Sequence, residues 1–272
     1  MDIKRTRKLL ITLLLSTVIL LALYNGEQYF SNLNNNDYVK KIDFRNLKNI
    51  KGNQNDKNLN DDLFKKVTTV IDNTKLERMN KDYVGWLKIE GTNIDTPVMK
   101  SDFYFRRNIK KKYSLAGTPF IPNYNLESII KPIFGHNLGY GRKDAFHDIT
   151  KYSNKDFYNT HQTVYFTENK SKGNKYKVVA YLEYSTGNKF DYLNINYRSS
   201  KEFLEWKKGI KNISKYSDKN FENIGYSRGK IIILSTCHST TFVDDGIRSV
   251  LICYSPERLK NINVDYYNKS DL

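Results

Sequence analysis

Hydrophobic residues in this chain fall mostly into short runs separated by polar, turn-forming segments, a pattern typical of β-strands. The clearest run, residues 231–234, has four consecutive apolar residues, three of them β-branched, and predicts a buried strand that ends at Cys237. A polar segment with an Asp-Asp-Gly turn follows, and Arg248 then opens a second strand over residues 250–254. If these two strands pair, Cys237 and Arg248 lie side by side at one end of the sheet.

The same pattern predicts at least five further strands and one well-marked helix. The helix begins at a capping box, Ser199-x-x-Glu202, and carries Phe203, Trp206 and Ile210 along one face. Strands and helices do not alternate as a parallel sheet requires, so the expected fold class is mostly β, a single antiparallel barrel or curled sheet with helical insertions. The further strands are expected at residues 85–89, 96–99, 129–134, 163–167 and 175–184.

The N-terminus carries a basic and then an apolar segment, as membrane-targeted chains do. Residues 1–8 contain four lysines and arginines. The uncharged residues 9–24 would span roughly 24 Å as a helix, short of a ~30 Å hydrocarbon core unless flanking residues contribute. No convincing small-x-small cleavage site follows, so we predict a cytoplasmic tail over residues 1–8 and an uncleaved signal anchor over residues 9–26; the alternative is a cleaved signal peptide. The basic residues predict a single-pass cell-membrane protein whose remainder is extracytoplasmic.

Beyond the apolar segment the composition changes twice. Ten of the thirty positions in residues 31–60 are asparagine, which predicts a loosely ordered extracytoplasmic linker over residues 27–60. An apolar stripe at helical spacing, capped by Asp61-Asp62, predicts a helix within residues 61–80. The remaining residues, 81–272, are predicted to form one globular domain. The members of the apolar stripe are Leu63, Val67, Val70 and Ile71.

The chain is strongly basic. It has 45 Lys and Arg against 29 Asp and Glu, a formal charge of +16, which favours anionic surroundings such as phospholipid or an acidic wall polymer. The lysines are scattered, and no zinc-finger, RNP-type or helix-turn-helix signature is present, so nucleic acid is not an expected partner. Only two cysteines and four histidines occur, without CxxC or HxxxH spacing, so we expect no metal site.

Cys237 is the candidate nucleophile. A thiol at a strand end beside a permanent cation gains thiolate character, and Arg248 offers a donor to a developing oxyanion. The alternative is a buried structural cysteine near a solvated arginine. Cys253 lies inside an apolar run and is interpreted as a core residue. As the partner of Cys237 the pattern favours His136, which follows a strand and a glycine, while His238 or no histidine at all remain alternatives.

These residues together resemble the class B sortases, over roughly residues 81–254. The family's Thr-Leu-x-Thr-Cys signature corresponds to residues 233–237, and its arginine on the next strand corresponds to Arg248. Its histidine motif matches residues 134–137, Phe-Gly-His-Asn. Residues 85–98 look like the start of a class B domain, and the helix before the cysteine strand also fits class B.

The resemblance implies a membrane-anchored cysteine transpeptidase. The implied fold is a sortase-like closed β-barrel of about eight mixed and antiparallel strands, with an N-terminal helical extension and a helix in the connection before the cysteine strand. Residues 81–272 would be the catalytic domain.

The resemblance also implies roles for the candidate residues. Cys237 would attack a carbonyl in the C-terminal sorting motif of a secreted protein and form a thioacyl enzyme, Arg248 would hold the substrate and stabilise the oxyanion, and His136 would transfer protons. An amine of cell-wall peptidoglycan would accept the acyl group, and no cofactor would take part. Class B relatives favour Asn-Pro-x-Thr-Asn-like pentapeptides. Substrate contacts are expected from the residues before the nucleophile, which are Leu234, Ser235 and Thr236.

Two rival functions remain open at the level of the sequence. The first is a cysteine-dependent peptidase or L,D-transpeptidase that acts on peptidoglycan stem peptides without a sorting-motif protein. The second is a membrane-tethered wall-binding module without catalysis, whose binding would be sensitive to salt and indifferent to alkylation of Cys237. The sequence also leaves open which protonation form of the cysteine–histidine pair is active.

Overall fold

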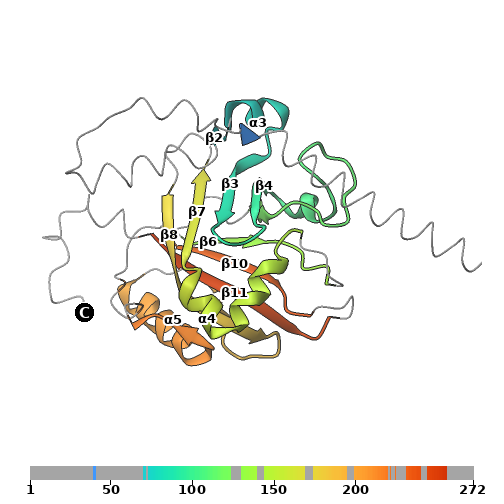
Figure 1. Ribbon diagram of the computed structural model, residues 1–272. Coiled ribbons are helices and arrows are strands. Elements are labelled where there is room, and N and C mark those ends of the chain that lie inside the picture. The colour runs from blue at the N-terminus through green and yellow to red at the C-terminus, as the bar shows by residue number, and fades with distance from the viewer. Residues whose placement is uncertain are drawn as a thin grey trace, which may run out of the picture. The chain divides into compact units, whose positions relative to one another are not determined.

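The chain divides into two compact units, Met1–Asp72 and Asn73–Leu272. In the first unit, two short antiparallel strands are described, β1 (Val39–Lys40) and β2 (Val70–Ile71). The second unit holds the predicted globular domain (Figure 1). The computed structural model describes residues 39–40, 70–71, 73–123, 130–139, 144–168, 174–194, 199–219, 221, 224, 231–239 and 244–255.

The predicted helix within residues 61–80 is wrong at Val70 and Ile71, which form strand β2. Two consecutive β-branched residues favour extended backbone, which explains the difference. The helix that the structure describes here is α3 (Asn73–Met79), whose buried residue is Leu76. The predicted tail and anchor, residues 1–26, lie outside the described residues, as does most of the predicted linker. None of the helices in the described part of the chain combines the length and the apolar character needed to cross a membrane.

The second unit is built around a closed β-barrel, as predicted. Its nine-stranded sheet has the order β11-β10-β6-β5-β4-β3-β7-β8-β9, and β8 also pairs with β11, which closes eight strands and leaves β9 outside. Neighbouring strands are antiparallel except for two parallel pairs, β4–β5 and β6–β10. The strands are β3 (Tyr83–Ile89), β4 (Asp95–Lys100), β5 (Phe120–Ile121), β6 (Ile130–Phe134), β7 (Thr163–Glu168), β8 (Asn174–Ser185), β9 (Tyr216–Ser217), β10 (Ile231–Cys237) and β11 (Ile247–Tyr254).

Strand β10 is apolar on both faces because each face covers a different core. Ile232 and Leu234 belong to a cluster with members from all eight barrel strands, the barrel interior. Ile231 and Ile233 point to the opposite face and belong to a second cluster that includes the buried side of helix α5 (Ser200–Ile213). The unbroken apolar run in the sequence therefore reflects a strand packed between the barrel interior and a helix.

Helix α5 forms as predicted from its capping box. The Ser199 side chain accepts a hydrogen bond from the Glu202 N–H, and the predicted stripe is the buried face. This helix lies in the connection before the cysteine strand, where the resemblance placed it. Shorter helices surround the barrel: η2 (Asp102–Arg106), η4 (His147–Ser153) and α4 (Lys155–Thr160).

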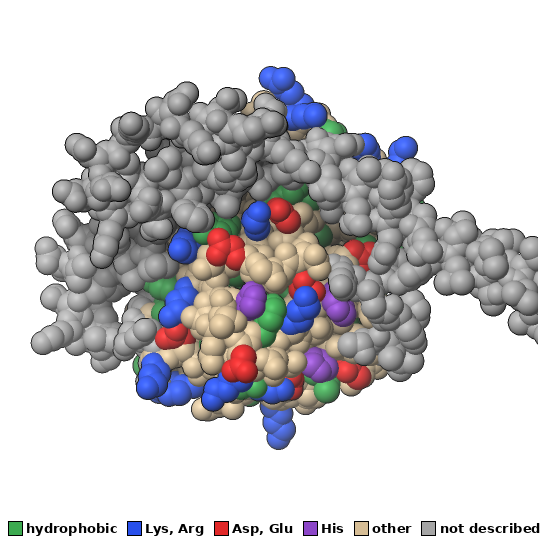
Figure 2. Space-filling model, in the orientation of Figure 1, with side chains coloured by type: hydrophobic (Ala, Val, Ile, Leu, Met, Phe, Trp, Pro, Cys, Tyr) green, Lys and Arg blue, Asp and Glu red, His purple; other side chains and the backbone are tan. Residues whose placement is uncertain are grey.

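On the face shown in Figure 2, the Lys and Arg side chains of the described residues are interspersed with Asp and Glu and do not form one block. Several form ion pairs, such as Lys88 on β3 with Asp95 on β4 at 3.2 Å, and Lys215, just before β9, with Glu183 on β8 at 2.6 Å. This distribution agrees with the scattered lysines of the sequence.

Candidate active site

Three strand ends meet at one edge of the barrel. β10 ends at Cys237, and its antiparallel register with β11 places Arg248 directly opposite. β6 runs parallel to β10, and the Gly135 N–H after β6 donates to the Ser235 carbonyl over 3.2 Å. His136 follows at once, so a thiol, a guanidinium and an imidazole come from neighbouring strand ends. The structure thus brings together the three residues that the sequence singles out.

The Cys237 side chain is partly buried at this edge. Burial raises the pKa of its thiol, the Arg248 guanidinium lowers it, and the carboxylates of Asp244 and Asp245 raise it again, with a net upward shift. The resting group at neutral pH is therefore the protonated thiol. Cys253 lies in the barrel interior with no exposed surface, and burial raises its thiol pKa strongly, which agrees with its interpretation as a core residue.

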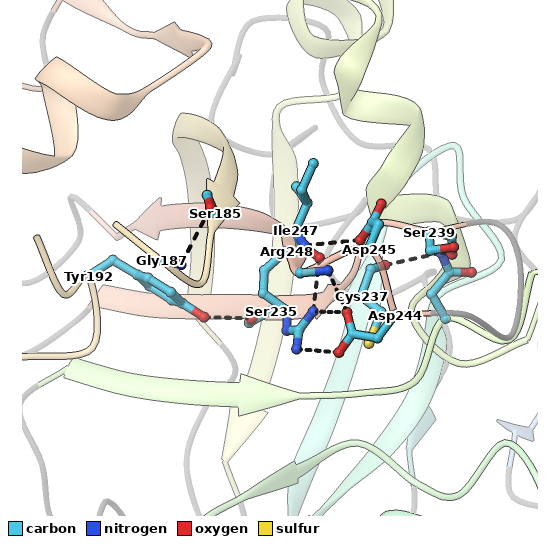
Figure 3. Close-up of polar contacts among 12 residues, drawn as sticks. Ser185, Gly187, Tyr192, Ser235, Cys237, Ser239, Asp244, Asp245, Ile247 and Arg248 are labelled. Atoms are coloured by element: carbon cyan, nitrogen blue, oxygen red, sulfur yellow. Dashed lines mark hydrogen bonds and ion pairs between the residues drawn. The ribbon is translucent and has the colours of Figure 1, made fainter. Parts of the chain in front are cut away.

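The Arg248 guanidinium is held by the turn that precedes β11 (Figure 3). Its Nη1 donates to Asp244 Oδ1 over 2.7 Å, and its Nη2 donates to Asp244 Oδ2 over 2.9 Å. Nη1 also donates to the Ile247 carbonyl over 3.0 Å. The hydrogen bonds from Arg248 lower the pKa of Asp244 to about 2, so this pair is fully ionised at neutral pH.

His136 is buried beneath an aromatic ring. Its ring centroid lies 3.9 Å from that of Phe105, the residue is 9% exposed, and its Nε2 has no hydrogen-bond partner among the described residues. Burial lowers the pKa of His136 to about 4, and the charge of Arg106 acts in the same direction, whereas the Phe105 carbonyl and Asp144 oppose the shift. The resting imidazole is therefore neutral at neutral pH.

The burial of His136 predicts a pH-dependent stability. Between its ordinary pKa of 6.5 and its folded pKa of about 4, the unfolded chain binds a proton that the folded chain excludes. The free energy of unfolding therefore falls as the pH falls through this window, by about 1.4 kcal/mol per pH unit between the two pKa values. Urea unfolding near neutral pH and at about pH 4.5 measures this effect, and wild type should lose more stability than His136→Gln. Equal losses in both proteins would contradict a buried neutral imidazole.

Asn137 links the loop after β6, which contains His136, to the end of β10 through side-chain hydrogen bonds. Its Nδ2 donates to the carbonyls of Cys237, over 3.1 Å, and Ser239, over 2.8 Å. Its Oδ1 lies 2.9 Å from His147 Nδ1 and accepts from the Gly139 N–H over 3.2 Å. One side-chain amide thereby fixes the backbone on both sides of the thiol relative to the loop after β6.

We expect Asn137→Ala to lower kcat by about tenfold to a hundredfold, because small displacements of reacting groups are costly in rate. The change also removes the hydrogen bonds that Asn137 donates to two carbonyls, a loss of about 1–3 kcal/mol in stability. Steady-state peptide cleavage and urea unfolding measure the two effects. Asn80→Ala is the matched control: Asn80 is 3% exposed and donates to Tyr104 and Ile109 rather than to β10. An equal loss of kcat in the control would limit Asn137 to a role in stability.

The predicted substrate-binding residues are all buried. Leu234 has no exposed surface and packs in the barrel interior, and its predicted contact with substrate stays a prediction. The Ser235 hydroxyl lies 2.9 Å from the Tyr192 hydroxyl, an arrangement seen in Figure 3. Thr236 is 3% exposed, and its hydroxyl has no hydrogen-bond partner among the described residues.

The other three histidines have separate settings. His238 Nδ1 lies 2.8 Å from the Ser249 hydroxyl, and His147 contacts Asn137 as described above. The His161 ring stacks on Phe157 with 3.8 Å between ring centroids. His136 is therefore the histidine whose strand end adjoins that of Cys237 through a parallel pairing.

Comparison with known proteins finds sortase B proteins similar to this chain in both sequence and structure. No family model matches the chain. Sortase B of Listeria monocytogenes is 32% identical over 178 residues, 63% of this chain and 69% of that protein. Sortase B of Staphylococcus aureus is 26% identical over 172 residues, 60% of this chain and 66% of that protein. The crystal structure of Clostridium perfringens sortase B superposes with a TM-score of 0.58 at 24% identity, covering 67% of this chain and 98% of that one.

Proposed function

Because this chain belongs to the sortase B family and is a cysteine transpeptidase, we propose that it anchors secreted proteins to the cell wall. It cleaves a C-terminal sorting motif through a thioacyl intermediate on Cys237, and it transfers the acyl group to an amine of peptidoglycan. The meeting of three strand ends at one barrel edge, with Cys237 opposite Arg248 and beside the loop of His136, is the observation that supports this function most directly.

Acylation begins from a neutral pair. The Cys237 thiol, with its raised pKa, and the His136 imidazole, with its lowered pKa, are both uncharged at rest. As the sulfur bonds to the substrate carbonyl carbon, the thiol proton passes to His136, and Arg248 donates to the developing oxyanion. The imidazolium then protonates the leaving amine, the peptide bond breaks, and a thioester remains on Cys237.

Transfer reverses the proton path. An amine of a wall peptide attacks the thioester carbonyl, and neutral His136 takes up the proton that the amine loses. The new amide bond forms as the sulfur leaves, and the proton on His136 returns to the Cys237 thiolate. No redox step is involved, and the enzyme returns to its neutral resting pair.

We place this reaction at the outer surface of the cell membrane. The apolar residues 9–26, preceded by four basic residues, support a signal anchor with the N-terminus inside. Such a tether would hold the catalytic domain close to secreted substrates as they emerge. The basic surface of the chain suits the anionic surroundings of membrane and wall.

Cleavage and transfer can be tested with one panel of reactants. The full-length protein is incubated with sorting-type pentapeptides and with amine-bearing wall peptides, and the products are identified by mass spectrometry. We expect one pentapeptide class to be cleaved at a single bond and its N-terminal part to be joined to the amine. Crosslinking of wall stem peptides without any pentapeptide would indicate an L,D-transpeptidase instead. Salt-sensitive wall binding without any bond cleavage would indicate a binding module.

A further inference from the structure

We propose that Asp244 is a latch that occupies the Arg248 guanidinium in the resting enzyme and leaves it when substrate binds. The inference rests on the proposed function in so far as it takes Arg248 to be the group that holds substrate. It adds a residue that controls access to this group, on the same turn as the active arginine. Nothing in the local sequence around Cys237 marks Asp244 for this role.

The contact between the two residues uses one N–H group of each terminal nitrogen of the guanidinium. Both carboxylate oxygens of Asp244 are engaged, one by Nη1 and one by Nη2, at 2.7 and 2.9 Å. The Ile247 carbonyl takes a second proton of Nη1. Three of the five guanidinium N–H groups are therefore occupied in the described structure. They include one N–H of each terminal nitrogen, the two donors that together bind a carboxylate through two hydrogen bonds.

The turn that carries Asp244 is held by local contacts. Its Oδ1 also accepts from the Gly246 N–H over 2.9 Å, and Gly246 has a φ of +69°, which suits glycine. The next carboxylate, Asp245, accepts from the Ile247 N–H over 3.0 Å and does not contact the guanidinium. Two adjacent acids thus have different tasks, and the second offers a matched control for the first.

The position of Asp244 suits displacement. Its side chain is 55% exposed, whereas that of Arg248 is 25% exposed, so the carboxylate returns to water at little desolvation cost once the pair separates. Exposed ion pairs of this kind contribute little net stability because water competes for both partners. A substrate group that enters beside Cys237 can therefore replace the carboxylate on the guanidinium.

Every consequence of the contact opposes catalysis. It occupies donors that the oxyanion needs, it offsets the positive charge that favours a thiolate, and the carboxylate itself raises the pKa of the Cys237 thiol. Among the described residues, the charged side chains that act on that thiol are Arg248 on β11 and Asp244 and Asp245 on the turn before it. The histidines nearby are His136 after β6 and His238 directly after the thiol. A residue whose only role was to position Arg248 for catalysis would not be expected to raise the pKa of the Cys237 thiol as well.

The alkylation rate of the thiol tests the latch without any peptide. Full-length wild type, Asp244→Asn and Asp245→Asn react with iodoacetamide over a range of pH, and Cys237→Ala gives the background from the buried Cys253. Both substitutions remove one negative charge, but only the first releases Arg248. We expect Asp244→Asn to react about threefold to tenfold faster than wild type near neutral pH, with the profile shifted to lower pH. Asp245→Asn should show a clearly smaller change.

Peptide cleavage gives the second readout. The latch predicts a lower KM in Asp244→Asn and Asp244→Ala, because substrate no longer competes with an internal carboxylate for Arg248. The latch would be contradicted if Asp244→Asn were alkylated no faster than Asp245→Asn. It would also be contradicted if Asp244→Asn lowered kcat and left KM unchanged, in which case Asp244 would be a positioning residue for Arg248. If no peptide is cleaved by any variant, including wild type, the proposed function fails, while the alkylation rates still decide on the latch.

Discussion

Replacing Cys237 with alanine is expected to lower kcat for peptide cleavage by at least about 10⁴-fold, because the covalent step has no other nucleophile. The second cysteine cannot take over, since Cys253 lies in the barrel interior without exposed surface. The fold should be retained, because Cys237 is only partly buried at the end of β10 and alanine removes a single heavy atom. Cleavage of the accepted pentapeptide by purified full-length protein measures the loss, with urea unfolding as a check of the fold.

Cys253→Ala is the matched control, the same substitution at the other cysteine. It should retain turnover while losing on the order of 1 kcal/mol of stability, because it leaves a small cavity in the core. Near-normal turnover in Cys237→Ala would contradict a thioacyl intermediate on Cys237. A loss of turnover confined to Cys253→Ala, with the fold intact, would reverse the assignment of the two cysteines.

Arg248→Lys is expected to lower kcat/KM by about 10²- to 10³-fold, since one lost oxyanion donor has an effect of this size. Lysine keeps the charge but replaces a planar fork with a single point charge, so it cannot bind the Ile247 carbonyl and a substrate oxygen in the geometry that the guanidinium offers. The residue lies on the first part of β11, opposite Cys237, and its loss leaves the barrel core untouched. Steady-state kinetics with the same pentapeptide gives the size of the effect.

Arg107→Lys is the control for this substitution. Arg107 donates to the Phe103 carbonyl at the surface and lies over the Phe103 ring at 4.1 Å. Its change to lysine should leave kcat/KM within about twofold of wild type. If Arg248→Lys also stays in that range, the guanidinium is not the oxyanion donor.

The β10–β11 pair is the part of the fold that the sequence predicts most fully. Its apolar runs, the turn between them and the placement of Cys237 opposite Arg248 all follow from strand geometry and local composition. Helix α5 is equally well marked by its cap. The predicted helix at Val70 and Ile71 fails because helical spacing of apolar residues can coincide with a short β-branched strand.

The parallel pairs are not visible in the sequence. β6 and β10 are separated by about a hundred residues, and their register depends on how the whole barrel closes. Yet this pairing is what sets His136 beside Cys237. The sequence predicts His136 from its glycine and its strand end and leaves His238 as an alternative, because the parallel pairing that brings the His136 strand end to Cys237 is not visible in the sequence.

The residues that the sequence did not single out contact Cys237, Ser239 or His136 from other segments of the chain. Asn137 stands within the histidine motif, but its bonds to the carbonyls of Cys237 and Ser239 depend on the closed barrel edge. Phe105 belongs to η2, and only folding brings its ring against His136. The protonation states of Cys237 and His136 were likewise open in the sequence, because burial shifts the pKa of each group.

Intact-mass spectrometry of the full-length protein after incubation with the pentapeptide library tests the central claim most directly. We expect an acyl adduct on wild type that is absent from Cys237→Ala and is released when an amine is added. Slower or absent release in His136→Ala would fit its role in proton transfer. An adduct of the same mass on Cys237→Ala, or no adduct with any peptide together with a Cys237 that iodoacetamide does not modify, would contradict the thioacyl mechanism.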